Sequence, residues 1–281
     1  MTIINSLGGG RIWPGIAVFW LGMLMLGASA SQASAGGMTA PGFTSGIPVY
    51  AKLPEGFYYL NQHSSGFREV DGVDIRTNTN IFFLYYQSPW EIAGGSLSFV
   101  LAPTLFEISS SPGERHAGLY NTYLGAQISW PTALDGLRVG YRISGYIPQG
   151  GDVAFDYGSI ENRFGLTYGR DHWSVLANFI IGTPVGDGSF DVAPNYFVAD
   201  FHVLKTFGKW TVGPVAHISA DLSDPSPGYK RQSQVAMGGL VGYDFGGLTL
   251  QTKLTLDMHE KNYGDKETIF WTNLIIPLGK R

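Results

Sequence analysis

Residues 248–258 read LTLQTKLTLDM, and their pattern decides the fold. The positions between the apolar residues are polar, and two of them are the charged residues Lys253 and Asp257. Side chains alternate between the two faces of a β-strand, so this segment predicts a strand with one apolar face and one charged face. The apolar side chains, with a single gap at Thr252, are Leu248, Leu250, Leu254, Leu256 and Met258.

The composition of the whole chain is that of a strand-rich protein. Of its 281 residues, 14% are charged, which is well below the roughly 25% typical of soluble domains. The chain contains 39 Gly and 14% aromatic residues, and it has no Cys, so disulfides and thiolate metal sites are excluded. A net charge of −4 argues against a nucleic-acid partner. These features favour many short strands over helices.

The first 35 residues have the features of an export signal. Arg11 supplies a positive charge, residues 16–28 (IAVFWLGMLMLGA) form an apolar run, and Ala33-Ser34-Ala35 matches a signal-peptidase site. The run is shorter than the about 20 residues that a membrane-spanning helix needs, although an N-terminal anchor helix is the alternative. We therefore predict a signal peptide over residues 1–35 and a mature chain that begins at Gly36.

Alternation of apolar and polar residues recurs along the rest of the chain and predicts further two-faced strands. The segments that show it are found at about 55–67, 74–88, 91–108, 120–131, 137–148, 160–169, 172–183, 195–207, 210–221, 232–245, 248–259 and 266–278. Longer polar links alternate strictly with tight turns. These turns are predicted at Pro89-Trp90, Asp135-Gly136, Arg170-Asp171, Gly208-Lys209 and Gly246-Gly247.

Short turns at one end and long loops at the other are typical of a bacterial outer-membrane barrel. A soluble sandwich or lectin-like barrel also alternates faces, but it does not require this asymmetry. Trp residues near strand ends, such as Trp90, Trp130 and Trp210, fit the aromatic girdles of a membrane barrel. We predict an all-β chain with a periplasmic segment over residues 36–54 and a transmembrane antiparallel barrel of about 12 strands over residues 55–281. Its expected partners are the lipid bilayer and the barrel-assembly machinery.

The same alternation assigns a set of charged side chains to the inside of the barrel. They could form a constriction that selects permeants by charge and size. The alternative is a mixed-sign network that fills the interior and holds the barrel's shape. Twelve strands lie between filled eight-stranded barrels and open porins, so strand number alone does not decide between an open and a filled lumen. These candidates are Arg138, Arg142, Arg163, Asp200, His202, Lys253 and Asp257.

Three segments carry a family resemblance: PEGFYYLNQHSSGF (54–67), NYFVADFHVLKTFGKWTVG (195–213) and VGYDFGGLTLQTKL (241–254). They resemble proteins associated with the meta-pathway of phenol degradation, and the resemblance covers roughly residues 50–281. It implies an outer-membrane, transporter-like barrel linked to uptake of aromatic or other hydrophobic compounds. A small solute of that kind is therefore an expected partner.

The segment GRDHWS (169–174) suggests an enzymatic alternative. Its His172 and Ser174 resemble the active-site segment of outer-membrane phospholipases. The residues after Ser174 differ from that family's Asn-Gly, and the alternation points both side chains inward, away from bilayer lipid. No phosphate-binding loop or metal-binding His spacing is present, so we predict no catalytic residue, cofactor or metal. A third hypothesis is a closed barrel whose external loops bind a partner.

Overall fold

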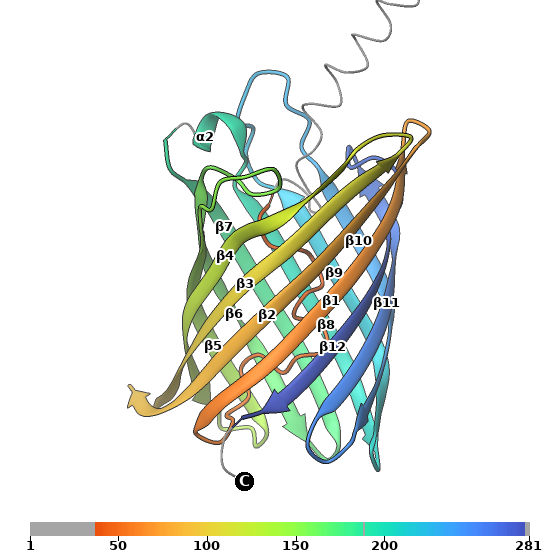
Figure 1. Ribbon diagram of the computed structural model, residues 1–281. Helices are drawn as coiled ribbons and strands as arrows, with labels where there is room; N and C mark the ends of the chain where they lie inside the picture. The colour runs from red at the N-terminus through yellow and green to blue at the C-terminus, as the bar shows by residue number, and fades with distance from the viewer. Residues whose placement is uncertain (1–36, 188, 279–281) are drawn as a thin grey trace, which may run out of the picture. The chain divides into compact units, whose positions relative to one another are not determined.

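The computed structural model describes residues 37–187 and 189–278. Its strands form one closed antiparallel barrel of 12 strands, in which β1 pairs with β12 (Figure 1). Every strand is paired on both sides, so the sheet has no open edge. The predicted fold class is confirmed. The predicted signal peptide over residues 1–35 lies outside the described residues.

The strands coincide closely with the twelve predicted segments. Their bounds are β1 (Gly56–Val70), β2 (Val73–Ile92), β3 (Gly95–Ser111), β4 (Arg115–Pro131), β5 (Leu137–Ile147), β6 (Gly158–Arg170), β7 (Trp173–Val185), β8 (Tyr196–Phe207), β9 (Trp210–Asp221), β10 (Ser233–Asp244), β11 (Thr249–Lys261) and β12 (Thr268–Pro277).

The turn predicted at Pro89-Trp90 is wrong, because both residues lie inside β2. The register between β2 and β3 shifts between Gln87 and Glu91, and this irregularity accommodates a proline that cannot donate to the ladder. The hairpin turn falls instead at Ala93-Gly94, where both φ values are positive, at 48° and 73°. A turn of this geometry matches the twist of the flanking strands.

The two ends of the barrel differ in their connections. The end where the chain enters β1 has short turns, such as residues 171–172 and 208–209. The other end has long loops, including residues 222–232, and one of them contains the helix α2 (Ser189–Val192). By analogy with outer-membrane barrels we call the long-loop end external and the short-turn end periplasmic. No helix among the described residues is long and apolar enough to cross a membrane.

Strict alternation of short and long connections is also wrong, because the first two external connections are short. They consist of residues 71–72 and 112–114. The strands that they join have 15 to 20 residues, whereas strands β5 to β12 have 10 to 13. At this side of the barrel, long β-hairpins with short turns take the place of long external loops.

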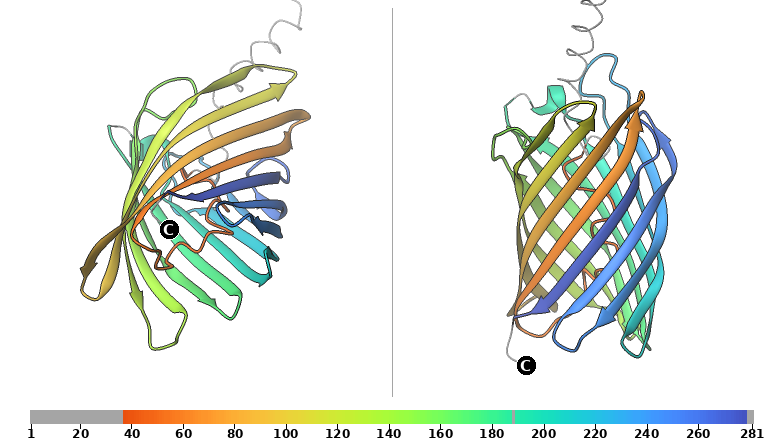
Figure 2. Two further views of the ribbon diagram at one scale, coloured as in Figure 1. Left: turned by 60° about the horizontal axis from the view of Figure 1, so that its bottom comes forward. Right: turned by 45° about the vertical axis from the view of Figure 1, so that its right-hand side comes forward.

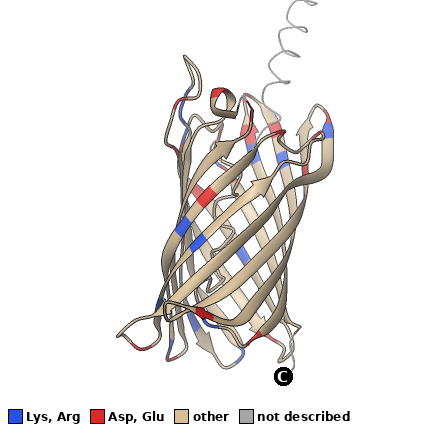
Figure 3. Cartoon of the chain, turned by 90° about the vertical axis from the view of Figure 1, so that its left-hand side faces the viewer, with Lys and Arg blue, Asp and Glu red and all other residues tan. Residues whose placement is uncertain are grey.

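The outer surface of the wall is mostly apolar. In β11, Leu254 and Leu256 point outward and are 44% and 47% exposed, whereas Lys253 and Asp257 point inward and are buried. Seen from one side, charged residues gather toward the two ends of the barrel, with few between them (Figure 3). This pattern suits a wall with hydrocarbon outside and polar groups inside.

Residues 37–54 form a segment that we call the plug. The sequence predicts a periplasmic segment over residues 36–54, but residues 37–54 lie inside the ring of strands (Figures 1 and 2). Phe43 and Tyr50 are buried there. The plug has no strand or helix and no charged residue before Lys52. Its backbone groups therefore need partners, and the polar inner wall supplies them.

We predict that a charge on the outer face of β11 destabilises the barrel. Replacing Leu254 by Lys should lower the free energy of unfolding from lipid vesicles by about 2–4 kcal/mol, because the ammonium group would be placed in hydrocarbon. Denaturant titration of vesicle-embedded protein measures this change, and Leu254→Met is the uncharged control. Equal stability of the Lys and Met variants would contradict a lipid-facing β11.

Candidate functional site

The interior of the barrel is the candidate functional site, because wall side chains bind the plug along most of its length. Main-chain carbonyls of Met38, Gly42, Phe43, Ser45, Gly46, Val49 and Tyr50 accept hydrogen bonds from wall side chains. Main-chain N–H groups of Gly42, Thr44, Gly46 and Tyr50 donate to others. The plug is thus bound through its backbone as much as through its side chains.

Two oppositely charged residues hold the turn at residues 42–45. The Asp200 carboxylate in β8 accepts hydrogen bonds from the N–H groups of Gly42 and Thr44, at 2.7 and 2.9 Å. The Lys253 ammonium in β11 donates to the carbonyls of Gly42 and Ser45. Gly42 has a φ of +85°, and a Cβ atom there would lie 2.6 Å from His217 Nδ1, so both conformation and space require glycine. We call Asp200 and Lys253 the clamp.

A buried ion pair holds the start of the plug. Glu161 and Arg163 lie on the inner face of β6, and the Arg163 guanidinium donates to the Glu161 carboxylate, with Nε at 3.0 Å. The Thr39 hydroxyl donates to the same carboxylate, and Arg163 Nη2 donates to Thr39 at 3.1 Å. The guanidinium carbon of Arg163 also lies 4.9 Å from the centre of the Phe43 ring, which favours a cation–π contact.

Tyr50 holds the periplasmic part of the plug. Its hydroxyl donates to Asn178 Oδ1 at 2.8 Å, and its N–H donates to the Thr167 hydroxyl. Its ring fills space beside Gly140 and Gly165, where added Cβ atoms would lie 2.0 and 3.0 Å from ring carbons. These glycines let the plug approach the wall closely.

The proposed hydrolase pair is not brought together. Asp171 and His172 are the two residues of the β6–β7 turn, each with positive φ. Ser174 instead meets His202, with 3.0 Å between Oγ and Nε2. Because His202 Nδ1 accepts the N–H of Gly46, Nε2 carries the ring proton and donates to Ser174. A histidine in this tautomer does not accept a proton from the serine hydroxyl.

The seven sequence candidates fall into three groups. Arg163, Asp200, His202 and Lys253 bind the plug directly. Arg138 and Arg142 act one step away, because they donate to Ser129 and Gln127, whose side chains donate to the carbonyls of Tyr50 and Val49. Asp257 lies elsewhere, near the external end, where it accepts from Gln234 and from the N–H of Glu267.

Sequence reasoning missed several partners of the plug. Glu161 shares the inner face of β6 with Arg163, so the same alternation could have identified it. Gln62 and Gln127 donate to the carbonyls of Phe43 and Val49, at 2.8 and 2.9 Å. Uncharged residues of this kind give no signal in the sequence until the plug is known to lie beside them.

Aromatic rings form a second feature of the lumen, which we call the aromatic strip. It begins in the external loop between β5 and β6 and follows the inner wall to the plug. Successive ring centres lie between 5.0 and 6.4 Å apart. Asn121 fixes its outer end by bonding the backbone of Phe155 and Tyr157. In order, the rings are Tyr157, Phe155, Tyr120, Tyr146, Tyr123, Phe43 and Phe83.

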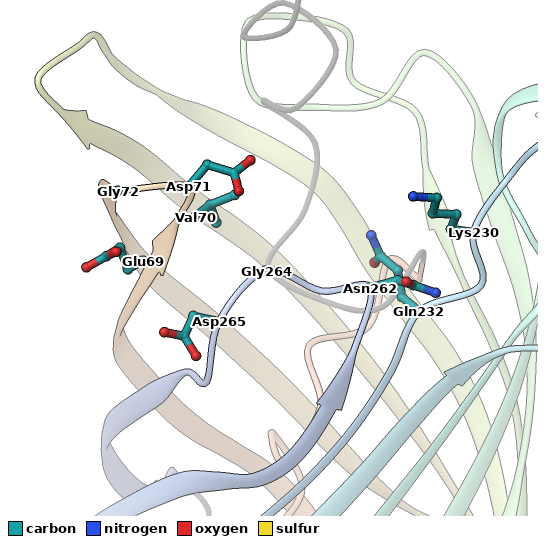
Figure 4. A pocket seen from close by; sticks show the side chains of 9 residues that line it. All are labelled: Glu69, Val70, Asp71, Gly72, Lys230, Gln232, Asn262, Gly264 and Asp265. Carbon is teal, nitrogen blue, oxygen red and sulfur yellow. The ribbon is translucent and has the colours of Figure 1, made fainter.

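A separate cavity of about 650 Å³ lies at the external rim (Figure 4). Carboxylates of Glu69, Asp71 and Asp265 and the ammonium group of Lys230 line it. This lining is polar and contains no aromatic ring. Among the described residues, no group of three His, Asp or Glu side chains is placed to hold a metal ion.

A buried carboxyl group lies in the external connection between β11 and β12. Glu267 is 2% exposed, and Tyr263 donates to its carboxylate at 3.1 Å. Gly66 leaves room for it, since a Cβ atom there would lie 2.5 Å from Glu267 Oε1. Burial raises the pKa of Glu267 to about 7, although the Arg68 charge opposes this shift.

Comparisons with known proteins agree with this architecture. The family model described as "Putative MetA-pathway of phenol degradation" matches residues 60–274. An outer membrane channel from Pseudomonas putida F1 has a TM-score of 0.68 at 14% identity, over 81% of this chain and 97% of that chain. The translocator domain of the autotransporter NalP from Neisseria meningitidis has a TM-score of 0.47 at 11% identity, over 94% and 97%. No curated protein sequence matches.

These comparisons confirm two of the expectations from the sequence. The family match confirms the resemblance that residues 54–67, 195–213 and 241–254 suggest. The likeness to the Pseudomonas channel confirms the outer-membrane type of barrel. At 14% identity that likeness concerns the fold alone.

We predict that Glu267 makes stability depend on pH. The unfolded carboxyl group titrates near 4.5, and the folded group near 7. Between these values the unfolded state loses its proton first, so raising the pH favours unfolding, by up to about 3 kcal/mol. The variant Glu267→Gln should match the parent at pH 4 and be more stable at pH 8.

Denaturant titration in vesicles at both pH values tests this prediction. Asp265→Asn changes an exposed carboxyl group of the same connection and serves as the control. The same loss of stability between pH 4 and pH 8 in the parent and in Glu267→Gln would contradict the assignment.

Proposed function

The chain belongs to this phenol-degradation family, and from that premise we propose that it passes small aromatic or other hydrophobic compounds across the outer membrane. The observation that carries the proposal is the aromatic strip, which runs from an external loop to the plug. An aromatic solute can make the same offset and edge-to-face contacts with these rings in place of a neighbouring ring. No chemical step is involved.

The plug sets the condition for passage. It occupies the lumen and is bound by Asp200 of β8 and Lys253 of β11. Solutes pass when the plug moves or rearranges, so the resting barrel is closed to most polar solutes. The lumen candidates then have two roles. The clamp residues and Arg163 hold the closed state, and they line a polar passage once the plug has moved.

The bonds of the plug suit a reversible closure. They are many and individually modest, since a neutral hydrogen bond contributes about 0.5–1.5 kcal/mol net and one to a charged group about 1.5–3 kcal/mol. When the plug leaves, water can take over the same partners on the wall. The charged wall groups therefore have hydrogen-bond partners in both states, and this limits the cost of opening.

We predict that weakening the clamp opens the channel. Lys253→Met removes the donor to the carbonyls of Gly42 and Ser45, so steady single-channel conductance in planar bilayers should rise at least several-fold above that of the parent. Lys230→Met, at the external rim, is the matched control and should leave conductance unchanged. Equal conductance of all three proteins would contradict a closure held by the clamp.

We also predict that the outer end of the strip selects for aromatic solutes. Phe155→Ala removes a ring between Tyr120 and Tyr157, so the uptake of phenol into proteoliposomes should fall several-fold while small-ion conductance stays the same. The control is Phe190→Ala, which removes an exposed ring from α2 in a different external loop. An identical uptake of phenol by both variants would contradict the route along the aromatic strip, but not the closure of the lumen by the plug.

A further inference from the structure

A cluster of polar side chains lies on the outer face of β1 and β2, although most of the outer wall is apolar. Inward-facing Gln62 and Ser64 are buried, so the alternating residues of β1 between and beside them face outward. The opposing residues of β2 face the same way by register. We call this cluster the outer polar patch, and it consists of Asn61, His63, Ser65, Asn78 and Asn80.

The members of the outer polar patch bond to one another. Asn61 Nδ2 donates to Asn80 Oδ1 at 2.6 Å, and the Ser65 hydroxyl donates to Asn78 Oδ1 at 2.7 Å. The Ser65 hydroxyl also lies 3.3 Å from His63 Nε2. These contacts use only part of the capacity of the patch, because each amide has two N–H donors and a carbonyl with two lone pairs.

Most of the outward side chains that border the patch are apolar. On β12, Leu274 pairs with Asn61 and Phe270 pairs with Ser65, while Thr272 between them pairs with His63. On β3, Leu105 pairs with Asn80, whereas Glu107 pairs with Asn78, accepts its side-chain N–H at 3.5 Å and forms an ion pair with Arg115. Toward the periplasmic end the outward positions of both strands are aromatic or aliphatic, with Phe57 stacked on Tyr86 at 4.7 Å. The patch therefore lies within the apolar belt of the wall.

The rest of the described outer wall shows the contrast. On β6 the outward amide of Asn162 accepts a single hydrogen bond, from the Tyr141 hydroxyl at 2.5 Å. Polar groups within a membrane are uncommon, and they usually face a protein partner or water. Five neighbouring polar side chains on a lipid-facing surface therefore indicate that something polar covers them.

We propose that the outer polar patch is an interface between two copies of this chain, related by a two-fold axis along the membrane normal. A two-fold interface brings the same surface of both copies together, so that surface must complement itself. Amides, a hydroxyl and an imidazole can each donate and accept, and they therefore satisfy this condition. Hydrogen bonds between such side chains are a known source of association inside membranes.

The uncharged character of the patch favours a second copy over other occupants. None of its five members is Asp, Glu, Lys or Arg. Lipid phosphate groups are recognised by Arg or Lys. The patch contains neither, and the Arg residues beside it already have partners in this chain, since Arg115 pairs with Glu107 and Arg76 lies over the Phe67 ring. A second barrel supplies amide and hydroxyl partners at the same depth of the bilayer, which acyl chains cannot do.

Cysteine cross-linking tests the interface on the full mature chain in lipid vesicles. Because the natural sequence has no Cys, a single substitution introduces one unique thiol. Disulfide-linked dimers should form under mild oxidation with at least one of Asn61→Cys, His63→Cys and Ser65→Cys, the one nearest the two-fold axis. Ala177→Cys, which replaces a small outward residue on β7 across the barrel, should stay monomeric. Cross-linking of the patch variants no greater than that of Ala177→Cys would overturn the proposal.

A second experiment measures association without a thiol in the patch. Asn61→Leu combined with Asn80→Leu removes both partners of one bond, which leaves neither partner of that bond unpaired. Energy transfer between labelled barrels should show at least tenfold weaker association than in the parent. Tyr141→Phe combined with Asn162→Leu removes an outward bonded pair on β5 and β6 and should have no such effect. Unchanged association in the patch variant, or a loss of solute uptake without a change in association, would overturn the interface.

Discussion

The closed ladder of backbone hydrogen bonds is the constraint on which the rest of this structure depends. In hydrocarbon an unpaired N–H or C=O has no water to bind, so the last strand must pair with the first. Here β12 meets β1 along the register from Tyr58–Pro277 to Phe67–Thr268. Once the ring is closed, each strand has one lipid face and one lumen face. Every polar or charged side chain must then be accommodated on one of these two surfaces.

The same constraint explains why the lumen is filled as it is. The plug has no ladder of its own, so its backbone groups depend on side chains of the wall. The wall depends on the plug in return, because Asp200 is buried and its main partners are plug groups. A buried carboxylate without such donors would be costly. The charged side chains of the lumen and the plug therefore depend on each other. If either moved away, water would have to replace it as the hydrogen-bond partner of the other.

The sequence predicts the parts of the molecule that repeat, because alternation is a periodic signal. It locates all twelve strands and places Asp200 and Lys253 on the inner face. It does not predict the plug, because an irregular segment has no period to detect. The sequence does not predict the aromatic strip either, for a different reason. The strand β4 has an irregularity opposite Pro103, so Tyr120 and Tyr123 both face inward although they are three positions apart, which breaks the period of two. In β1, Asn61, Gln62, His63 and Ser64 are polar in succession, so no contrast separates the outer polar patch from the inner wall.

Phe43 links the closure of the barrel to the proposed route through it. Its carbonyl accepts from Gln62, and its ring lies within 6.0 to 6.4 Å of Phe83 and Tyr123 in the aromatic strip. An aromatic solute that travels along the strip competes for the place of this ring. By thermodynamic linkage, a solute that binds the strip better when Phe43 has left it must shift the plug toward the open state. Under the proposed function, polar solutes have no such differential affinity and meet the plug in its closed state, so a preference for aromatic compounds would follow from the closure itself.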